Sequence, residues 1–304
     1  MSNIPVVLVH KGRANYLRFA IKQASHFHND VILLGDNSNA DFCDRHFQYD
    51  NFKSGLTSRL GMNYEHMSPN PYEFELVCLE RWFVLLELMK VNSLDRIFYI
   101  DSDVLLYCNI DKALSSYSGL QAALCSEDQE YEDYKWFTSG HCSFWTIKLL
   151  EEFCEFVLDN YSNKERLYKK WNWHKQTGTP GGICDMTLLY LFYNSNGDRI
   201  LNLSSTLNSM IFDNGIGSDY QGLFQTETRS FPSKVNMRRV SFEDGQPYSI
   251  TNEGNRISFK ALHFSSGAKI YMPFFLSYSG SIMVKIKTIA SFGLIYLKHL
   301  LKIR

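Results

Sequence analysis

The feature that most constrains the fold is a pair of short apolar runs with one helix between them, all within the first 35 residues. Ile4–His10 and Val31–Gly35 are almost continuously apolar, as parallel strands buried on both faces are. Ala14–Ser25 carries apolar residues at helical spacing. A strand, a helix and a second strand in this order open a doubly wound, Rossmann-like sheet, so we predict an α/β fold with helices flanking a mixed sheet.

The rest of the chain continues the alternation of strands and helices. Asn70-Pro71 followed by Glu73 has the residue types of a helix start, and an apolar strand spans Arg96–Ile100. No internal repeat and no linker rich in Pro, Gly or Ser interrupts the pattern, so we expect one domain over residues 1–281 and a helix over residues 282–304. Further expected helices are 109–116, 147–161 and 183–193, a further strand is 120–125, and short β runs occupy 235–264.

The net charge of the chain is close to zero, but the charges are unevenly distributed. Five of the 31 Lys and Arg residues lie in residues 282–304, which hold no Asp or Glu. The other residues hold 26 basic and 32 acidic side chains. This mildly acidic body argues against a nucleic-acid-binding protein, because phosphate contacts need a basic surface.

Cysteine usage indicates a reducing compartment. The seven Cys residues form no CxxC pair and are odd in number, which fits buried thiols better than a disulfide or zinc framework. The first residues, MSNIPVVLVHKG, lack the basic start of a signal peptide, and no run of 18 uncharged apolar residues predicts a spanning helix. We therefore expect a cytoplasmic protein.

The motif that most clearly carries chemistry is Asp101-Ser102-Asp103, directly after the strand Arg96–Ile100. Two carboxylates at the end of a buried strand carry a desolvation cost that a bound cation offsets. Carboxylate oxygens are hard ligands and suit Mg²⁺ or Mn²⁺. The alternative is a solvated loop that caps the next helix.

Two other segments supply cationic or metal-binding side chains. Arg81 has apolar neighbours three and four residues away on its helix, so it is expected to be buried against a phosphate or a carboxylate. The alternatives are that it snorkels to solvent or pairs with a core aspartate. His263 ends a β run, Gly267 allows close approach of the backbone, and Lys269 can reach a phosphate. A purely structural histidine is the alternative for His263.

Polar residues also follow the first two strands. His10 and Lys11 come after the first strand, and Asp36 comes after the second. Ligands of open α/β sheets bind beyond the carboxyl ends of the strands, so these residues are candidates for a ligand site. The motif GxGxxG is absent, which argues against dinucleotide binding of the Rossmann type.

These segments together resemble the nucleotide-sugar-dependent glycosyltransferases of the GT-A fold, and most closely glycosyltransferase family 8. The resemblance spans most of residues 4–272 and rests on the Asp-Ser-Asp motif and on Leu262–Lys269, after which Ile270-Tyr271 replaces the Pro-Trp of the family. It implies metal-dependent transfer of a sugar from a nucleotide sugar, a UDP-sugar, to a hydroxyl of a glycan or glycolipid acceptor. The family's metal ligands correspond to Asp101, Asp103 and His263, and its donor-binding residues to Arg81, Ser102, Gly267 and Lys269, with His10, Lys11 and Asp36 expected at the base and ribose.

Two further segments fit this resemblance. Phe137–His141 is similar to the stretch under the donor sugar, and Gly181–Met186 is similar to the Gly-Asp segment at the reaction centre, with Met186 where a Gln is common. The resemblance makes Asp185, beside Asp101, a catalytic candidate. Asp185 is either a general base for the acceptor hydroxyl or a ligand of the sugar hydroxyls. A structural aspartate in the first turn of a helix is the alternative.

The tail and one aromatic stretch suggest where the acceptor binds. In residues 282–304 the apolar side chains share one helical face and the lysines the other, which predicts an in-plane anchor on the anionic inner face of a membrane; a helix docked on the core is the alternative. Aromatic residues make up 15% of the chain, and they either build the core or stack on sugars. We expect Trp171 and Trp173, in a basic loop over residues 164–175, and His141 at the acceptor.

Two other functions have some support in the sequence. An apolar strand followed by Asp-x-Asp also begins the haloacid-dehalogenase phosphatases, in which the first aspartate is a nucleophile. A non-catalytic sugar-binding module is the second. Dependence of turnover on Mn²⁺ separates the transferase from the binding module, since the latter needs no metal-ligating aspartates.

Overall fold

The computed structural model describes residues 4–127, 129–205, 210–213, 215–217, 222–231, 233–278 and 280–300. Contacts within the chain divide it into two compact units. Unit 1 comprises Met1–Gly12, Asp30–Asp101 and Ile110–Ser205, and unit 2 comprises Arg13–Asn29, Ser102–Asn109 and Thr206–Arg304. The single domain over residues 1–281 stays a prediction.

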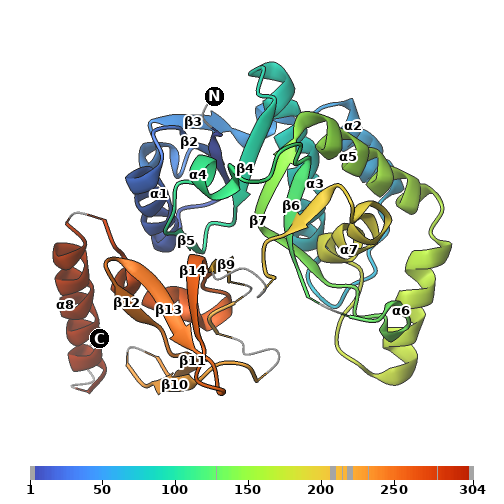
Figure 1. The fold of residues 1–304 in the computed structure, drawn as a ribbon. Helices are drawn as coiled ribbons and strands as arrows, with labels where there is room; N and C mark the ends of the chain where they lie inside the picture. Colours follow the sequence, from blue (N-terminus) through green and yellow to red (C-terminus); the bar gives the residue numbers. More distant parts are fainter. Residues whose placement is uncertain are drawn as a thin grey trace. The chain divides into compact units, whose positions relative to one another are not determined.

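Unit 1 is built on a seven-stranded sheet of strand order β3-β2-β1-β4-β7-β6-β8 (Figure 1). Strands β1 to β4 are mutually parallel, whereas β7 runs antiparallel to both of its neighbours. The carboxyl ends of β1, β2, β4 and β6 therefore meet at one edge, where β7 begins. Their bounds are β1 (Val6–Val9), β2 (Val31–Gly35), β3 (Arg45–Gln48), β4 (Arg96–Ile100), β6 (Ala122–Ser126), β7 (Thr138–Thr146) and β8 (Ile200–Asn202). The predicted α/β fold with a mixed sheet is confirmed.

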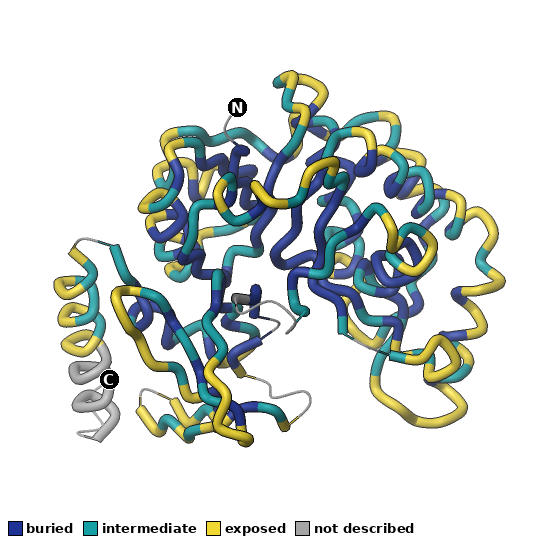
Figure 2. The backbone as a smooth tube through the Cα atoms, in the orientation of Figure 1, coloured by how far each residue is buried: buried dark blue, intermediate teal, exposed yellow. Residues whose placement is uncertain are grey.

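Helices cover this sheet through a core that is rich in aromatic rings. Helices α3 and α7 pack on α5, and α5 and α7 pack on β7. Trp82, Trp145 and Phe153 are fully buried and contact one another at ring distances of 5.5–5.9 Å, so much of the aromatic content serves the core. Figure 2 shows that the central strands of unit 1 are largely buried. The helices are α2 (Gly55–Asn63), α3 (Tyr72–Val91), α4 (Ile110–Leu114), α5 (Ile147–Ser162), α6 (Glu165–Thr177) and α7 (Asp185–Asn196), with 3₁₀ turns η1 (Ala40–Phe42), η2 (Tyr49–Phe52) and η3 (Tyr131–Asp133).

Unit 2 is built on a smaller sheet of order β12-β13-β14-β5, on which β9 pairs with β14. Helix α1 packs against β5, where Gln23 Nε2 donates to Leu106 O at 3.0 Å. A separate hairpin consists of β10 and β11. The elements are α1 (Asn15–Phe27), β5 (Val104–Leu106), β9 (Met210–Phe212), β10 (Thr226–Arg229), β11 (Val235–Arg238), β12 (Ser241–Glu243), β13 (Gln246–Ile250), β14 (Arg256–His263), the 3₁₀ segment η4 (Ser266–Phe275) and α8 (Ser281–Leu300).

Two local expectations were wrong. Residues 164–175 form most of α6 rather than a loop, because Leu167, Lys170 and His174 recur at helical spacing and bury one face. The start of α3 also differs: Pro71 is its N-cap and makes no side-chain cap, while Asn70 Nδ2 donates instead to Glu75 Oε1 at 2.7 Å.

The C-terminal helix is present as α8, which packs against η4 within unit 2. Residues 301–304 of the predicted helix lie outside the described residues. Among the helices that the structure describes, none has the length and apolar character needed to cross a membrane.

Candidate active site

A largely buried arginine, Arg81, gathers two carboxylates at the carboxyl edge of the sheet in unit 1. Asp101 follows β4, and its Oδ1 accepts hydrogen bonds from Arg81 Nη1 at 2.8 Å and from the Tyr99 hydroxyl. Arg81 Nη2 donates to Oδ2 of Asp185, the first residue of α7. We call Arg81, Tyr99, Asp101 and Asp185 the arginine cluster. It joins residues from α3, β4 and α7 that are up to 104 positions apart in the chain.

The electrostatics of the arginine cluster favour a permanent cation between two anions. Burial by itself would lower the pKa of Arg81, but Tyr99, Asp185 and Asp101 outweigh it and hold that pKa well above its ordinary value. For Tyr99, burial itself raises the pKa and outweighs the opposing effect of Arg81, so its phenol remains a neutral donor. Both Nη atoms of Arg81 donate to aspartates, Nη1 to Asp101 and Nη2 to Asp185. This is the pairing with a core aspartate that the sequence offered as an alternative. A direct contact of Arg81 with phosphate stays a prediction.

Close packing fixes the position of Asp185. Its Oδ2 also accepts a hydrogen bond from Trp82 Nε1 at 3.2 Å, while Oδ1 accepts none from the described residues. The indole of Trp82 lies against Gly140 of β7, where an added Cβ would come within 2.4 Å of the ring. Gly182 lies just before α7, and an added Cβ there would approach Met67 O to 2.6 Å. These two glycines therefore allow the close packing around the segment that carries the carboxylate.

A second cluster forms in unit 2 around Asp103. Strand β5 pairs with β14 so that Val104 lies opposite His263. Asp103 Oδ1 is 3.5 Å from His263 Nε2, and its Oδ2 is 3.0 Å from Lys269 Nζ. Lys269 also lies over the ring of Tyr16 from α1, at 5.0 Å from the centroid. We call Asp103, His263 and Lys269 the Asp103 cluster.

Asp103 is buried yet ionised in this cluster. Burial alone would raise its pKa, but His263 and then Lys269 outweigh this and lower the pKa below its ordinary value. The ammonium of Lys269 is thus the cation that Oδ2 of Asp103 contacts. A carboxylate and an imidazole offer hard oxygen and borderline nitrogen ligands, so Asp103 and His263 of unit 2 fit Mn²⁺ or Mg²⁺ chemically.

A buried ion pair that the sequence patterns did not predict supports His263. Arg238 Nη1 pairs with Asp213 Oδ1, and both side chains are almost inaccessible to solvent. Asp213 Oδ2 accepts the backbone N–H of His263 at 3.4 Å. The guanidinium of Arg238 is stacked over Phe224, 4.0 Å from the ring centroid. Asp213 follows a short apolar run, as Asp101 does. The run before Asp213 has only the three residues of β9, which is too short to be recognised as a strand from the sequence.

The residues predicted for the base and ribose share one loop region of unit 1. Gly12 N donates to Asp36 Oδ2 at 2.6 Å, which connects the ends of the first two strands. Asn39, which sequence analysis did not select, donates to His10 O and to Gly12 O at 2.9 and 2.8 Å. Lys11 lies 3.5 Å from Asp50. His10, Lys11 and Asp36 are thus brought together, and their role with a nucleotide stays a prediction.

The remaining candidates are more scattered. Trp171 is half-buried on α6 and packs against the core, and Trp173 on the same helix lies 5.8 Å from the ring of Tyr134. His141 is 1% exposed on β7, with Nδ1 2.7 Å from Ser139 Oγ. Ser102 occupies the turn between the two aspartates, and Gly267 lies in η4, where an added Cβ would meet only Val235 at 3.5 Å. The acceptor role of Trp171, Trp173 and His141 stays a prediction.

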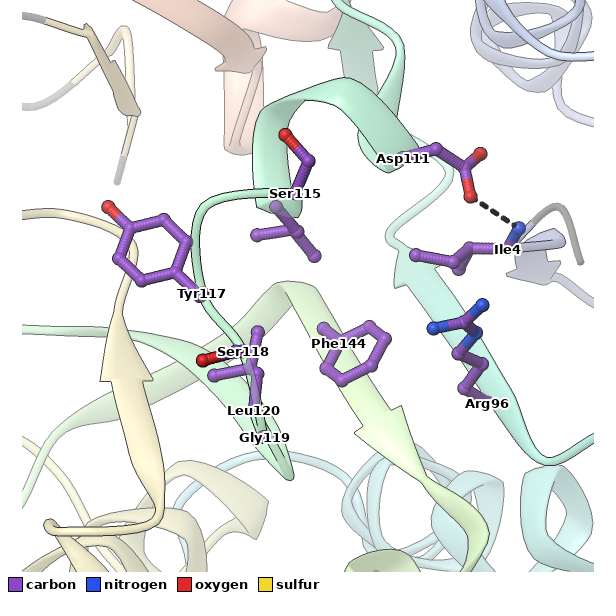
Figure 3. A pocket seen from close by; sticks show the side chains of 10 residues that line it. Ile4, Arg96, Asp111, Ser115, Tyr117, Ser118, Gly119, Leu120 and Phe144 are labelled. Atoms are coloured by element: carbon purple, nitrogen blue, oxygen red, sulfur yellow. Dashed lines mark hydrogen bonds between the residues drawn. The ribbon is translucent and has the colours of Figure 1, made fainter. Parts of the chain in front are cut away.

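A small cavity lies at the opposite edge of the sheet in unit 1 (Figure 3). It measures about 220 Å³, and Ile4, Arg96 and Phe144 line it at the amino ends of β1 and β4. Asp111 Oδ1 accepts the backbone N–H of Ile4 there at 3.1 Å. The cavity lies at the start of β4 and the arginine cluster at its end, so the cavity takes no part in that site.

Comparison with known proteins gives structural matches of low sequence identity. No protein-family model matches the chain, and a search of curated proteins finds no match. The chain is similar to mouse xyloside xylosyltransferase 1 in its apo form, at 10% identity over 69% of this chain and 88% of that one, with a TM-score of 0.49. It is also similar to an active-site mutant of LgtC, at 13% identity over 95% and 96% of the two chains, with a TM-score of 0.47. A further similar structure is the glycosyltransferase GlyE of Streptococcus pneumoniae TIGR4, at 12% identity over 96% of this chain and 64% of that one, with a TM-score of 0.41.

Proposed function

We propose that the protein is a metal-dependent glycosyltransferase that moves a sugar from a nucleotide sugar, a UDP-sugar, to a hydroxyl of a glycan or glycolipid. The observation that carries this proposal is the Asp103 cluster, in which a buried, ionised carboxylate faces an imidazole and an ammonium. Asp101 precedes Asp103 by two residues, so the chain itself supplies a second carboxylate nearby. A carboxylate pair with a histidine and a lysine suits a divalent cation that carries a diphosphate.

The ligands proposed for Mn²⁺ or Mg²⁺ are Asp101, Asp103 and His263. When bound, the metal would neutralise charge on the diphosphate leaving group. Lys269 supplies a second positive charge, and it is one-third exposed, so it can leave Asp103 for a phosphate oxygen. The hydrogen bond that the His263 backbone N–H donates to the Asp213 carboxylate keeps His263 at the end of β14.

In this proposal the arginine cluster positions the reacting groups. The acceptor oxygen forms a bond to the anomeric carbon of the sugar while the bond from that carbon to the diphosphate oxygen breaks. Asp185 Oδ1 either takes the proton of the acceptor hydroxyl, or binds hydroxyls of the donor sugar while the departing diphosphate oxygen takes that proton. Arg81 holds Oδ2 of Asp185 and Oδ1 of Asp101, so it orients both carboxylates at the edge of the sheet.

A donor screen tests the function directly. The purified protein with Mn²⁺ is offered UDP-, GDP-, CMP- and dTDP-sugars, and slow release of the nucleotide is followed. We expect release from one UDP-sugar and its loss on addition of a chelator. Phosphate release from a phosphate ester without nucleotide release would favour the phosphatase, and no release from either substrate would favour the sugar-binding module.

We also propose that α8 attaches the protein to an anionic membrane surface, so that a glycolipid acceptor lies close to the enzyme. Four apolar residues on one face of α8, Ile282, Met283, Ile286 and Ile289, are 53–70% exposed. The partly buried side of the helix consists instead of Ser281, Val284, Lys285 and Thr288. A helix that shows its apolar face to solvent and carries lysines has the character of an interfacial anchor on the inner face of a membrane.

Substituting two of these apolar residues tests the membrane contact. We expect Met283→Glu with Ile286→Glu to lower binding to phosphatidylglycerol-containing vesicles about 100-fold, since two buried apolar side chains contribute about 3 kcal/mol. Flotation of the full chain measures the bound fraction. The matched control is Met62→Glu with Phe74→Glu, which places the same charges at two exposed apolar positions of unit 1. Equal loss in both variants, or no binding by the unmodified chain, would contradict the anchor.

A further inference from the structure

We propose that a cavity of unit 1 between η3, α5 and α6 binds a neutral stretch of the oligosaccharide acceptor, away from the hydroxyl that reacts. This inference rests on the proposed glycosyltransferase function and adds a binding site to it. The site would hold uncharged pyranose units by stacking them on tyrosine rings.

The cavity measures about 700 Å³, enough for more than one sugar ring. Tyr131, Tyr134 and Trp136 line it from one segment, and Phe156 and Asn160 line it from α5. Tyr131 is 42% exposed, and Tyr134 is half-buried, so both can meet a ligand. Aromatic rings beside amide and hydroxyl groups suit a sugar, which presents an apolar C–H face and a polar rim.

We call Tyr131, Tyr134 and Trp136 the aromatic platform, and contacts between their rings make it rigid. The ring of Trp136 lies 4.9 Å from that of Tyr131 and 5.2 Å from that of Tyr134, and Trp136 Nε1 donates to Tyr131 O at 2.7 Å. Tyr134 and Trp136 both have positive φ angles, 51° and 39°, which are unfavourable for aromatic residues. Buried Lys170 of α6 holds this strained backbone by donating to Tyr134 O and Lys135 O at 2.8 and 2.6 Å. Strain that the surrounding structure maintains is typical of ligand-binding segments.

The charges around the cavity favour a neutral ligand. Asp159 and Glu165 face Arg166 and Lys169, and Glu165 pairs with Lys169 at 2.8 Å. The two acidic and two basic side chains together carry no net charge. The neighbouring segment adds Glu130, Glu132 and Asp133 against Lys135, which pairs with Asp133 at 3.5 Å, so its net charge is negative. Lys170 beneath it is engaged by backbone carbonyls, so a phosphate or nucleotide would meet repulsion.

The platform belongs to the same unit and the same sheet edge as Asp185. Its segment leaves β6 and enters β7 at the edge where β4 presents Asp101. The ring of Trp136 stacks on Tyr190 at 6.2 Å. Tyr190 is on α7, five residues after Asp185, which corresponds to about 7.5 Å along the helix axis. An oligosaccharide whose terminal hydroxyl reaches Asp185 can therefore extend onto the platform.

Oligosaccharide binding and donor hydrolysis test the site separately from the transferase function. The intact chain is titrated with maltohexaose and with lacto-N-neotetraose at millimolar concentration, and saturation transfer to the sugar protons is measured. We expect binding of at least one of them, weakened about tenfold by Tyr131→Ala and by Tyr134→Asn, because each removes one stacking ring. Asparagine tolerates the positive φ at position 134, so this variant keeps the backbone.

The matched control is Tyr168→Ala, which removes a 40% exposed tyrosine of α6 that does not line the cavity. Nucleotide release without acceptor should be unchanged in Tyr168→Ala. Absence of binding by the unmodified chain, or equal weakening by Tyr168→Ala, overturns the site while leaving the transferase proposal intact. Loss of donor hydrolysis in the unmodified chain would instead refute the transferase, whatever the sugar binding.

Discussion

Replacing Asp103 with asparagine is expected to lower the rate of Mn²⁺-dependent nucleotide release at least about 100-fold. Asparagine keeps the size of the side chain but removes the charge that meets His263 and Lys269. A neutral amide is a weaker ligand of a divalent cation and leaves the diphosphate less well neutralised. The rate is measured on the UDP-sugar identified in the donor screen, across a titration of Mn²⁺.

A matched substitution separates loss of the metal ligand from a general effect on the fold. Asp244→Asn makes the same chemical change at an exposed turn of unit 2, where Asp244 has a φ of 49° that asparagine also adopts. Its rate should equal that of the unmodified protein. If Asp103→Asn retained full activity with unchanged Mn²⁺ dependence, Asp103 would not be a metal ligand and the proposed site would be wrong.

Replacing Arg81 with methionine is expected to lower the free energy of unfolding by about 3–5 kcal/mol, because it leaves buried carboxylate charge without its partner. The Asp185 side chain is only 5% exposed and would keep just the indole donor of Trp82. Urea unfolding followed by tryptophan fluorescence measures the change. Addition of Asp185→Asn should restore part of the loss, since it removes the unpaired charge.

The control for Arg81 is an exposed ion pair of the same kind. Arg256 pairs with Glu243 at 2.6 Å, and both side chains are well exposed, so Arg256→Met should change stability little. Equal effects of Arg81→Met and Arg256→Met would show that the arginine cluster is not a buried network. A double variant no more stable than Arg81→Met alone would show that Asp185 does not depend on Arg81.

Local patterns predicted the elements that carry the site but not the partners of each side chain. Apolar runs placed β2 and β4 at their observed bounds, and therefore placed Asp101 at a strand end. The apolar neighbours of Arg81 predicted its burial and its need for an anion. That this anion includes Asp185 depends on the packing of α3 against α7, which periodicity does not encode.

The same limit explains what was missed. Asp213 follows β9 and Arg238 ends β11, two short strands that pair with different partners, so neither residue lies within a long periodic pattern. Residues 164–175 were expected to be a loop because their charged and aromatic composition obscures the spacing of Leu167, Lys170 and His174. Tertiary burial of these three residues decides the helix, and it is not visible in propensity alone.

Lys170 gives the aromatic platform a tolerance to alkaline conditions. Burial lowers the pKa of this lysine to about 8, so it loses its charge well before an exposed lysine would. A neutral amine still has two N–H groups, and the two acceptors are the carbonyl oxygens of Tyr134 and Lys135. Lys170 can therefore make the same two hydrogen bonds whether it is protonated or neutral. The shape of the platform does not depend on the charge of Lys170.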